Sequence, residues 1–266
     1  MKYPKKVSEH IVSWIDNYIN KSGVKGIVVG VSGGVDSALT STLCAETGQN
    51  VLCLEMPIYQ NKDQVSRSEK HIDWLKSKYT NVTSKKIELD KTFESFVSSL
   101  PNNISYKHEL SLANTRSRLR MVTLYYFSAL NDYIVAGTGN RVEDFGIGFY
   151  TKYGDGGVDI SPIADLLKSE VFSLARFHKI IDEIIEAEPN DGLWNDNRSD
   201  EDQIGASYEE IETAMINFYK NEKDMLKLIY KFKENKKFSL SASNRSLKLI
   251  SQFKWEKVLL ILNKIF

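Results

Sequence analysis

Residues 26–37 decide the fold class of this chain, and they read Gly26-Ile-Val-Val-Gly-Val-Ser-Gly-Gly-Val-Asp-Ser37. The first six residues are apolar or small and rich in β-branched side chains, a pattern that predicts a short buried strand. A glycine-rich turn comes next, and residues 38–47 predict a helix that stops at Gly48. A strand, a tight turn and a helix in this order predict an α/β architecture.

The same alternation continues along the chain. Further buried strands are predicted over residues 51–56, 82–89 and 133–136, with helices over 62–78 and 109–130 between them. Strands that alternate with helices imply a parallel sheet with helices on both faces. We therefore expect an α/β fold with a doubly wound parallel sheet, whose ligands bind at the carboxyl ends of strands near the point where strand order reverses.

Other segments complete this outline. An apolar stripe at helical spacing predicts a helix before the first strand, with Val7, Ile11, Trp14, Ile15, Tyr18 and Ile19 directed to the core. The glycine-rich stretch 146–157 and the stretch 187–206 are long irregular loops of the kind that covers ligands. Ser207-Tyr-Glu-Glu210 is a capping box that opens a helix, and two more helices are expected in the tail.

Composition and charge narrow the class of protein. The 266 residues are 42% apolar and 26% charged, with 35 basic and 35 acidic side chains and so a net charge of zero. No global positive field points to nucleic acid or to an anionic membrane. Two cysteines without a Cys-x-x-Cys pair exclude a disulfide framework, and no apolar run reaches the ~18 residues of a membrane span. We expect a soluble, cytoplasmic protein with a single domain over residues 1–266.

The glycine-rich turn has the chemistry of a phosphate cradle. Gly33 and Gly34 let the backbone point successive N–H groups at an anion, and the following helix N-terminus adds partial positive charge. Ser32 and Ser37 offer hydroxyl groups to phosphate oxygens. Asp36 is an anion that would repel a bare phosphate, so a divalent cation, most simply Mg²⁺, must lie between them.

This turn is neither the Walker loop, which needs Gly-Lys-Ser/Thr, nor the dinucleotide Gly-x-Gly-x-x-Gly fingerprint. It resembles the pyrophosphate loop of the N-type ATP pyrophosphatases, which split ATP between the α and β phosphates and adenylylate a substrate. The resemblance implies the adenine nucleotide α hydrolase-like version of the fold, with AMP and pyrophosphate as products.

Further motifs narrow the resemblance within that superfamily. Together, and in order, they are similar to ammonia-dependent NAD synthetases over residues 26–212. The motifs are Ala113-Asn-Thr-Arg-Ser-Arg-Leu-Arg-Met121, Gly137-Thr-Gly-Asn-Arg-Val-Glu143, Thr151-Lys-Tyr-Gly-Asp-Gly-Gly157 and Ser199-Asp-Glu201.

The resemblance implies an ATP site and a metal site. Asp36 and Glu143 correspond to the metal-binding carboxylates, and Lys168 would neutralise the charge that develops on the departing pyrophosphate. The residues expected to bind ATP are Gly30, Val31, Ser32, Gly33, Gly34, Val35, Asp36, Ser37, Thr138, Lys168 and Asn190.

The resemblance also implies a site for the second substrate, deamido-NAD (nicotinate adenine dinucleotide). Arg118 and Lys152 suit its phosphates, and Asp159 could accept from ribose hydroxyls. Asn114 either joins them or makes an interhelical hydrogen bond, and the sequence leaves both readings open. The apolar helix over residues 113–131 corresponds to a family dimer interface that lines this site, which implies a homodimer.

Two positions depart from the family pattern. Asn190 stands where many members have threonine after the proline of the loop, and its amide could still donate to a phosphate. A C-terminal His-Lys pair that contacts the dinucleotide in many members is absent, and Asn244-Arg245 is the nearest polar-basic pair.

The implied reaction has two steps. The substrate carboxylate attacks the α-phosphate of ATP, and ammonia then attacks the acyl adenylate and expels AMP. Asp155 is the candidate to contact ammonium or the adenylate, although its position in Gly-Asp-Gly equally suits a plain turn residue. Cys44 and Cys53 fall within a predicted helix and strand, so neither suggests the nucleophile of a glutaminase, and free ammonia is the expected nitrogen donor.

Two alternatives stay open. Another N-type ATP pyrophosphatase, such as a tRNA-modifying ligase, should show a basic surface or reactive cysteines, and neither is evident. A nucleotide-binding homologue that has lost catalysis would explain the altered positions 190 and 244. The joint presence of Asp36, Glu143 and Lys168 argues against it.

Overall fold

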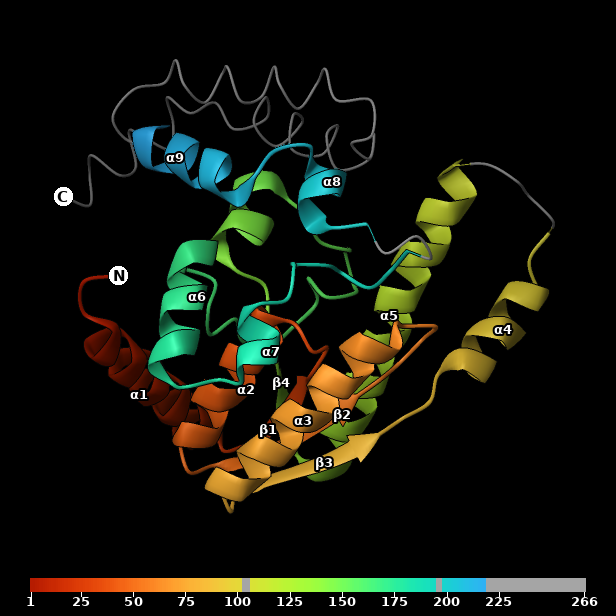
Figure 1. Cartoon of the computed structure of the whole chain (residues 1–266). Helices are drawn as coiled ribbons and strands as arrows, with labels where there is room; N and C mark the ends of the chain where they lie inside the picture. The colour runs from red at the N-terminus through yellow and green to blue at the C-terminus, as the bar shows by residue number, and fades with distance from the viewer. Residues whose placement is uncertain (102–105, 195–197, 219–266) are drawn as a thin grey trace, which may run out of the picture.

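A four-stranded parallel sheet lies at the centre of the chain (Figure 1). The computed structural model describes residues 1–101, 106–194 and 198–218. The strands are β1 (Gly26–Gly30), β2 (Asn50–Glu55), β3 (Val82–Lys86) and β4 (Tyr133–Ala136), in the order β3-β2-β1-β4. This confirms the expected α/β fold. The predicted tail helices and the pair Asn244-Arg245 lie outside the described residues.

Helices connect and flank the strands (Figure 1). The larger ones are α1 (Pro4–Ser22), α2 (Val35–Glu46), α3 (Lys62–Lys78), α4 (Asp90–Ser98), α5 (Tyr106–Asn131), α6 (Lys168–Phe177) and α9 (Tyr208–Phe218). The short ones are the π-helix η1 (Arg141–Ile147), α7 (Asp182–Ile185) and α8 (Asp200–Ile204).

Side chains that alternate along the central strands contribute to two hydrophobic cores, one on each face of the sheet. In β1, Ile27 and Val29 join a core with α1, α2 and α6, whereas Val28 points to the opposite face and joins the core that α5 covers. All three side chains are fully buried. Because both faces of the sheet are covered at its centre, β1, β2 and β4 are largely apolar runs, whereas the edge strand β3 reads Val-Thr-Ser-Lys-Lys and is mostly exposed.

Strand order reverses between β1 and β4. From β1 the chain crosses through α2 to β2 and through α3 to β3, and it then returns through α5 to β4 on the other side of β1. The segments after β1 and β4 therefore leave neighbouring carboxyl ends in diverging directions, which opens a crevice between them. These segments are residues 31–37 and 137–143, the two that carry the predicted phosphate and metal residues.

Several predicted boundaries were wrong by a few residues. The helix predicted from Ala38 begins at Val35, because Gly34 is extended (φ −96°, ψ 159°) and serves as its N-cap. The strand predicted to Leu89 ends at Lys86. The helix predicted over 109–130 spans residues 106–131. The capping box at Ser207 is confirmed, since the Ser207 backbone N–H donates to Glu210 and the Glu210 N–H donates to the Ser207 hydroxyl.

The predicted inward stripe of α1 was only partly right. Ile11, Ile15 and Ile19 are buried, but Trp14 is 42% exposed and Tyr18 is 40% exposed. The two rings pack against each other with centroids 5.9 Å apart. Isoleucines four residues apart already fill the contact of α1 with the core, so the larger aromatic side chains lie at its edge.

The glycine-rich stretch 146–157 is irregular as predicted, apart from its first two residues, which end η1. Its turns pack against α5, where Asp155 accepts a hydrogen bond from Ser117. Within the described ranges, no helix combines the length and apolarity that crossing a bilayer requires.

Candidate active site

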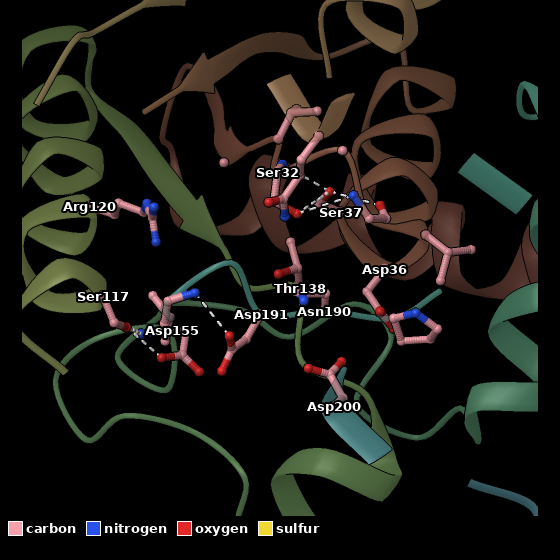
Figure 2. Close-up of a pocket in the computed structure, with 18 of the residues that line it drawn as sticks. Ser32, Asp36, Ser37, Ser117, Arg120, Thr138, Asp155, Asn190, Asp191 and Asp200 are labelled. Atoms are coloured by element: carbon pink, nitrogen blue, oxygen red, sulfur yellow. Dashed lines mark hydrogen bonds between the residues drawn. The ribbon is translucent and has the colours of Figure 1, made fainter. Parts of the chain in front are cut away.

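A cavity opens at the reversal point of the sheet (Figure 2). All eleven residues predicted to bind ATP line it, together with Glu143 and Asp155. The segments that form it come from the ends of β1, β2 and β4, from α5, from the start of α6 and from loop 187–200. The tertiary structure thus brings together residues that lie up to about 170 positions apart in the sequence.

The glycine-rich loop is held in shape by its two serines. The Ser37 hydroxyl accepts from the Ser32 backbone N–H at 3.1 Å and donates to the Gly34 carbonyl at 3.0 Å. The Ser32 hydroxyl accepts from the Gly34 N–H at 3.3 Å. These bonds fold the loop over the first turn of α2, as an anion-binding helix start requires. Val31 and Val35 are buried in the core, so their contribution to the cavity comes from the backbone.

Position 33 requires a glycine for two reasons, its positive φ angle and the lack of room for a Cβ atom. Its φ is +82°, and a Cβ built on it would lie 2.4 Å from the Gln64 carbonyl oxygen of α3. At Gly34 φ is −96°, and the nearest atom to a Cβ would be the Ser32 hydroxyl at 3.4 Å. Only the first glycine of the pair is therefore demanded by the fold itself.

Lys168 lies between two carboxylates on the floor of the cavity. Its ammonium nitrogen is 2.6 Å from Asp36 Oδ2 and 2.8 Å from Glu143 Oε1. The Lys168 side chain is only 3% exposed, and those of Asp36 and Glu143 are 17% and 14% exposed. The structure thus brings these three predicted site residues together in one cluster.

Lys168 and Glu143 stabilise each other's charge, whereas burial raises the pKa of Asp36 above its ordinary value although the charge of Lys168 acts in the opposite direction. Burial alone would lower the pKa of Lys168, but Asp36 and Glu143 outweigh it and raise the pKa above its ordinary value. Burial alone would raise the pKa of Glu143, but the charge of Lys168 and the hydrogen bonds it receives lower that pKa. Lys168 is therefore a permanent cation at neutral pH, and Glu143 a carboxylate.

Asn140 and Tyr208 complete the cluster, and the sequence analysis gave neither a role. Asn140 is fully buried and donates from Nδ2 to Asp36 at 2.9 Å, while its Oδ1 accepts from the Val142 and Glu143 N–H groups at the start of η1. The Tyr208 hydroxyl donates to Glu143 at 2.6 Å. Asn140 stands within the motif 137–143, so the signal was present in the sequence. Nothing in the sequence pointed to a site role for Tyr208, which only follows the capping residue Ser207.

Asp200 is the third carboxylate on this side of the cavity (Figure 2). It is 6% exposed, its Oδ2 lies 3.2 Å from the Tyr208 hydroxyl, and its Oδ1 has no hydrogen-bond partner. Burial first, and then the charge of Glu143, raises the pKa of Asp200 well above its ordinary value. Asp200 belongs to the Ser199-Asp-Glu201 motif, to which the sequence analysis assigned no site role.

The donor set at Asp36 and Glu143 fits Mg²⁺. Both side chains present carboxylate oxygens, the ligands that Mg²⁺ prefers, and both lie within bonding distance of one cationic nitrogen. Among the described residues no three His, Cys, Asp or Glu side chains form a complete metal cage. Any Mg²⁺ held by Asp36 and Glu143 would therefore need substrate phosphates and water as its remaining ligands.

Asp155 lies on the other side of the cavity, beneath α5 (Figure 2). Its Oδ1 accepts from the Ser117 hydroxyl at 2.6 Å and from the Thr151 N–H at 3.1 Å. Its own N–H donates to Ser117 at 3.0 Å. Asp155 is thus a turn residue that also lines the cavity. Its contact with ammonium or the adenylate stays a prediction.

Asn190 has partners within its own loop. Its Oδ1 accepts from the Gly192 N–H at 2.6 Å, and its Nδ2 donates to the Arg198 carbonyl. The side chain therefore shapes loop 187–200 around the cavity. Its contact with ATP stays a prediction, as does that of Thr138, which also lines the cavity.

The residues predicted for the dinucleotide do not line this cavity. They lie together on its outer side, where α5 meets residues 151–159. Arg118 is exposed and donates to the Lys152 carbonyl at 3.1 Å, and the Thr151 hydroxyl donates to Asn114 at 2.6 Å. Asp159 accepts from the Tyr125 hydroxyl at 3.0 Å.

A phosphate-type loop beside a buried lysine and carboxylate cluster, at the reversal point of a parallel sheet, defines a nucleotide-binding α/β enzyme. Comparison with known proteins gives the family. A family model described as NAD synthase matches residues 7–257. The chain is 39% identical over 211 residues to the NH(3)-dependent NAD(+) synthetase of Carboxydothermus hydrogenoformans, an alignment that covers 79% of this chain and 84% of that protein.

Comparison with solved structures supports the same family. The NMN synthetase from Francisella tularensis matches with a TM-score of 0.75 and 29% identity, over 89% of this chain and 96% of that one. The NH3-dependent NAD synthetase from Campylobacter jejuni, in complex with the nitrate ion, matches with a TM-score of 0.69 and 27% identity, over 94% of both chains. The chain belongs to the NAD synthase family, which confirms the family and fold expected from the sequence.

Proposed function

We propose that this chain amidates the nicotinate group of deamido-NAD with ammonia, at the expense of ATP, and releases NAD, AMP and pyrophosphate. It acts as a C–N ligase. The observation that carries the proposal is the Asp36–Lys168–Glu143 cluster beside the phosphate-type loop, in a chain of the NAD synthase family.

In the first step a carboxylate oxygen of the substrate attacks the α-phosphorus of ATP. The bond from that phosphorus to the oxygen bridging the α and β phosphates breaks, and pyrophosphate leaves. The N–H groups of loop 31–37 bind the phosphates, and Lys168 offsets the charge that gathers on the leaving group. The carboxylate is already ionised near neutral pH, so positioning matters more than proton transfer.

In the second step the ammonia nitrogen attacks the carbonyl carbon of the acyl adenylate. The C–O bond to AMP breaks, and the nitrogen loses a proton as the amide forms. Asp155 faces the cavity with Oδ2 outside its hydrogen bonds to Ser117 and Thr151, so it can hold ammonium and accept the proton whose loss frees the nitrogen lone pair for attack. The second proton, lost as the amide forms, passes to water.

Asp36 and Glu143 would hold Mg²⁺. The ion supplies charge neutralisation on the triphosphate when it is bound. The ammonium group of Lys168 lies between the two carboxylates. It would turn toward the phosphates of ATP once the carboxylates bind Mg²⁺.

The second substrate would reach the cavity along α5. Arg118 and Lys152 supply cationic groups there, and Asn114 and Asp159 supply polar ones. Their position outside the cavity suits a long dinucleotide, since only its nicotinate end needs to meet ATP.

A homodimer through α5 is part of the proposal. Three large apolar side chains at helical spacing, Val122, Tyr126 and Leu130, are 67%, 63% and 63% exposed. Such a stripe on the outside of a helix favours burial against a partner. A second copy would cover this stripe close to the residues expected to bind the dinucleotide.

The oligomeric state is tested by light scattering coupled to size-exclusion chromatography. The wild type should elute as a dimer, and Val122→Glu should elute as a monomer with reduced affinity for deamido-NAD. Ser13→Glu, at an exposed polar position on α1, is the matched control and should stay dimeric. A monomeric wild type that is fully active would contradict the dimer.

The activity is tested by following NAD formation and pyrophosphate release with ATP, Mg²⁺ and deamido-NAD. Ammonium should support turnover, whereas glutamine should not. Asp36→Ala should remove turnover while the circular dichroism spectrum stays unchanged. Nucleotide binding without turnover under every condition would support an inactive homologue instead.

A second candidate is the same reaction on nicotinate mononucleotide, which would make NMN. The similarity to the Francisella tularensis NMN synthetase favours it. The assay therefore includes nicotinate mononucleotide as a separate substrate, and the larger kcat/KM decides between the two.

A further inference from the structure

The end of the cavity beneath α5 holds a half-buried arginine that no reaction step described above uses. Arg120 projects from α5 toward the cavity (Figure 2) and is among its lining residues. Its Nε donates to the Met56 carbonyl at the end of β2, at 3.0 Å. Its Nη2 is buried and has no hydrogen-bond partner.

Arg120 has no carboxylate partner among the described residues, because none lies within ion-pair distance of it. The acidic residues nearest to it in electrostatic terms are Asp191 and Asp155, and both are engaged elsewhere. Asp191 accepts from the Leu193 N–H at 2.9 Å and from Gln203 at 3.1 Å. Asp155 accepts from Ser117 and Thr151.

The guanidinium group remains charged despite this isolation. Burial lowers the pKa of Arg120 to about 10, which still leaves it protonated at neutral pH. A half-buried cation whose Nη2 is shielded from water and has no hydrogen-bond partner is costly, and an anion placed opposite it would offset that cost. The guanidinium group is held in place for such an anion by the hydrogen bond from Nε to the Met56 carbonyl and by the buried Met121 next to it in α5. Its planar set of N–H donors can bind two oxygens of an anion at once.

We propose that Arg120 binds an anionic oxygen group of one of the two reactants and positions it for the attack of the carboxylate on the α-phosphorus. Two groups have this chemistry, the carboxylate of the acid substrate and the phosphate of ATP. The nearness of Arg120 to Asp155 favours the carboxylate, since the ammonia that Asp155 holds must attack that same carbon. This choice of substrate rests on the proposed function.

The experiment compares the wild type with Arg120→Gln and Arg120→Lys by isothermal titration calorimetry. The ligands are deamido-NAD, NAD and the non-cleavable α,β-methylene analogue of ATP with Mg²⁺. Deamido-NAD and NAD differ only in carboxylate against carboxamide, so their ratio of affinities reports the contact directly. Arg176→Gln, on α6 and outside the cavity lining, is the matched control.

If Arg120 binds the carboxylate, Arg120→Gln should weaken binding of deamido-NAD about tenfold or more and leave that of NAD unchanged. If it binds the phosphate, affinity for the ATP analogue should fall by a similar factor while the deamido-NAD to NAD ratio is unchanged. Arg120→Lys keeps the charge without the fork and should fall between, with circular dichroism showing that it folds.

The proposal is overturned if both variants fold and bind all three ligands as the wild type does. It is also overturned if all three affinities fall together, since that would mark a structural role. A failure of the proposed function would give another result, since the wild type itself would then neither bind nor turn over deamido-NAD. The titrations with the ATP analogue would still test the role of Arg120 in that case.

Discussion

Lys168 and Asp36 are 132 positions apart in the chain, yet the lysine ammonium lies 2.6 Å from the aspartate carboxylate. The contact joins the start of α6 to the first turn of α2 across the crevice at the reversal point of the sheet. It ties the phosphate-type loop to the segment after β4, where Glu143 accepts the second bond from the same nitrogen. We therefore expect stability and catalysis to depend on the same three side chains.

Replacement of Lys168 by Met should damage both. The carboxylates of Asp36 and Glu143 would lose the cation between them, so we expect the free energy of unfolding to fall by about 3–5 kcal/mol. Turnover should fall about 100-fold or more. Urea unfolding and pyrophosphate release measure the two effects, and added Mg²⁺ should restore part of the lost stability by neutralising the carboxylates.

Lys70→Met is the matched control for that experiment. Lys70 pairs with Glu183 at 2.9 Å, but both side chains are more than half exposed, so its loss should change the free energy of unfolding by less than about 1 kcal/mol. An equal loss of stability in the two variants would contradict the importance given to the buried cluster.

Gly33→Ala should disrupt the phosphate loop, whereas Gly34→Ala should be tolerated. The first change places a methyl group 2.4 Å from the Gln64 carbonyl at a positive φ, and the second meets only the Ser32 hydroxyl at 3.4 Å. The positive φ alone costs about 1–2 kcal/mol. The KM for ATP should rise in the first variant and change little in the second. Equal KM values would show that the loop shape is not needed for ATP.

His71 makes stability depend on acidity. It is fully buried, its Nε2 lies 3.0 Å from the Ser41 hydroxyl, and burial lowers its pKa to about 4. The unfolded chain binds a proton near the ordinary pKa of 6.5, whereas the folded chain does not. Stability from this residue is therefore complete above about pH 6.5 and decreases by at most about 3 kcal/mol as the pH falls toward 4.

Urea unfolding of the wild type and His71→Gln between pH 4.5 and 7.5 checks this dependence. The variant should lose stability less steeply as the pH falls, and His10→Gln, at an exposed position, should follow the wild type. Parallel curves for all three proteins would rule out the role of His71.

Tyr208→Phe should weaken the binding of Mg²⁺ at the carboxylates expected to hold it. The hydroxyl donates to Glu143 and lies 3.2 Å from Asp200, so its removal takes a donor from two buried carboxylates. We expect a loss of about 1–3 kcal/mol in the free energy of unfolding. The Mg²⁺ concentration that gives half-maximal activity should rise, because Glu143 is no longer oriented.

Tyr79→Phe removes a partly exposed tyrosine hydroxyl that bonds Glu46 at 3.2 Å. It should leave the Mg²⁺ dependence unchanged. A Tyr208→Phe variant with wild-type Mg²⁺ dependence would show that Tyr208 supports the fold and not the site.

Local patterns determined the element types and the identity of the loop. The apolar run 26–31, the glycine pair and the helix after it are properties of neighbouring residues, so a single sequence shows them. The positions of Asp36, Glu143 and Lys168 within family-like motifs also predicted a shared site, and the structure joins them. Errors of a few residues arose at element ends, where capping and packing decide. The exposure of Trp14 depended on space at the core, which periodicity does not measure.

Only the tertiary structure decided which side chains meet without a motif to join them. Tyr208 reaches Glu143 because α9 packs beside η1. Arg120 lacks a carboxylate partner because Asp155 is bonded to Ser117 and Asp191 to the Leu193 N–H and Gln203. It also separated the residues expected to bind the dinucleotide from those of the ATP cavity. Hydrogen bonds and charges act over a few ångströms in space, so their partners follow from the fold, whereas strand, turn and helix follow from residues adjacent in the chain.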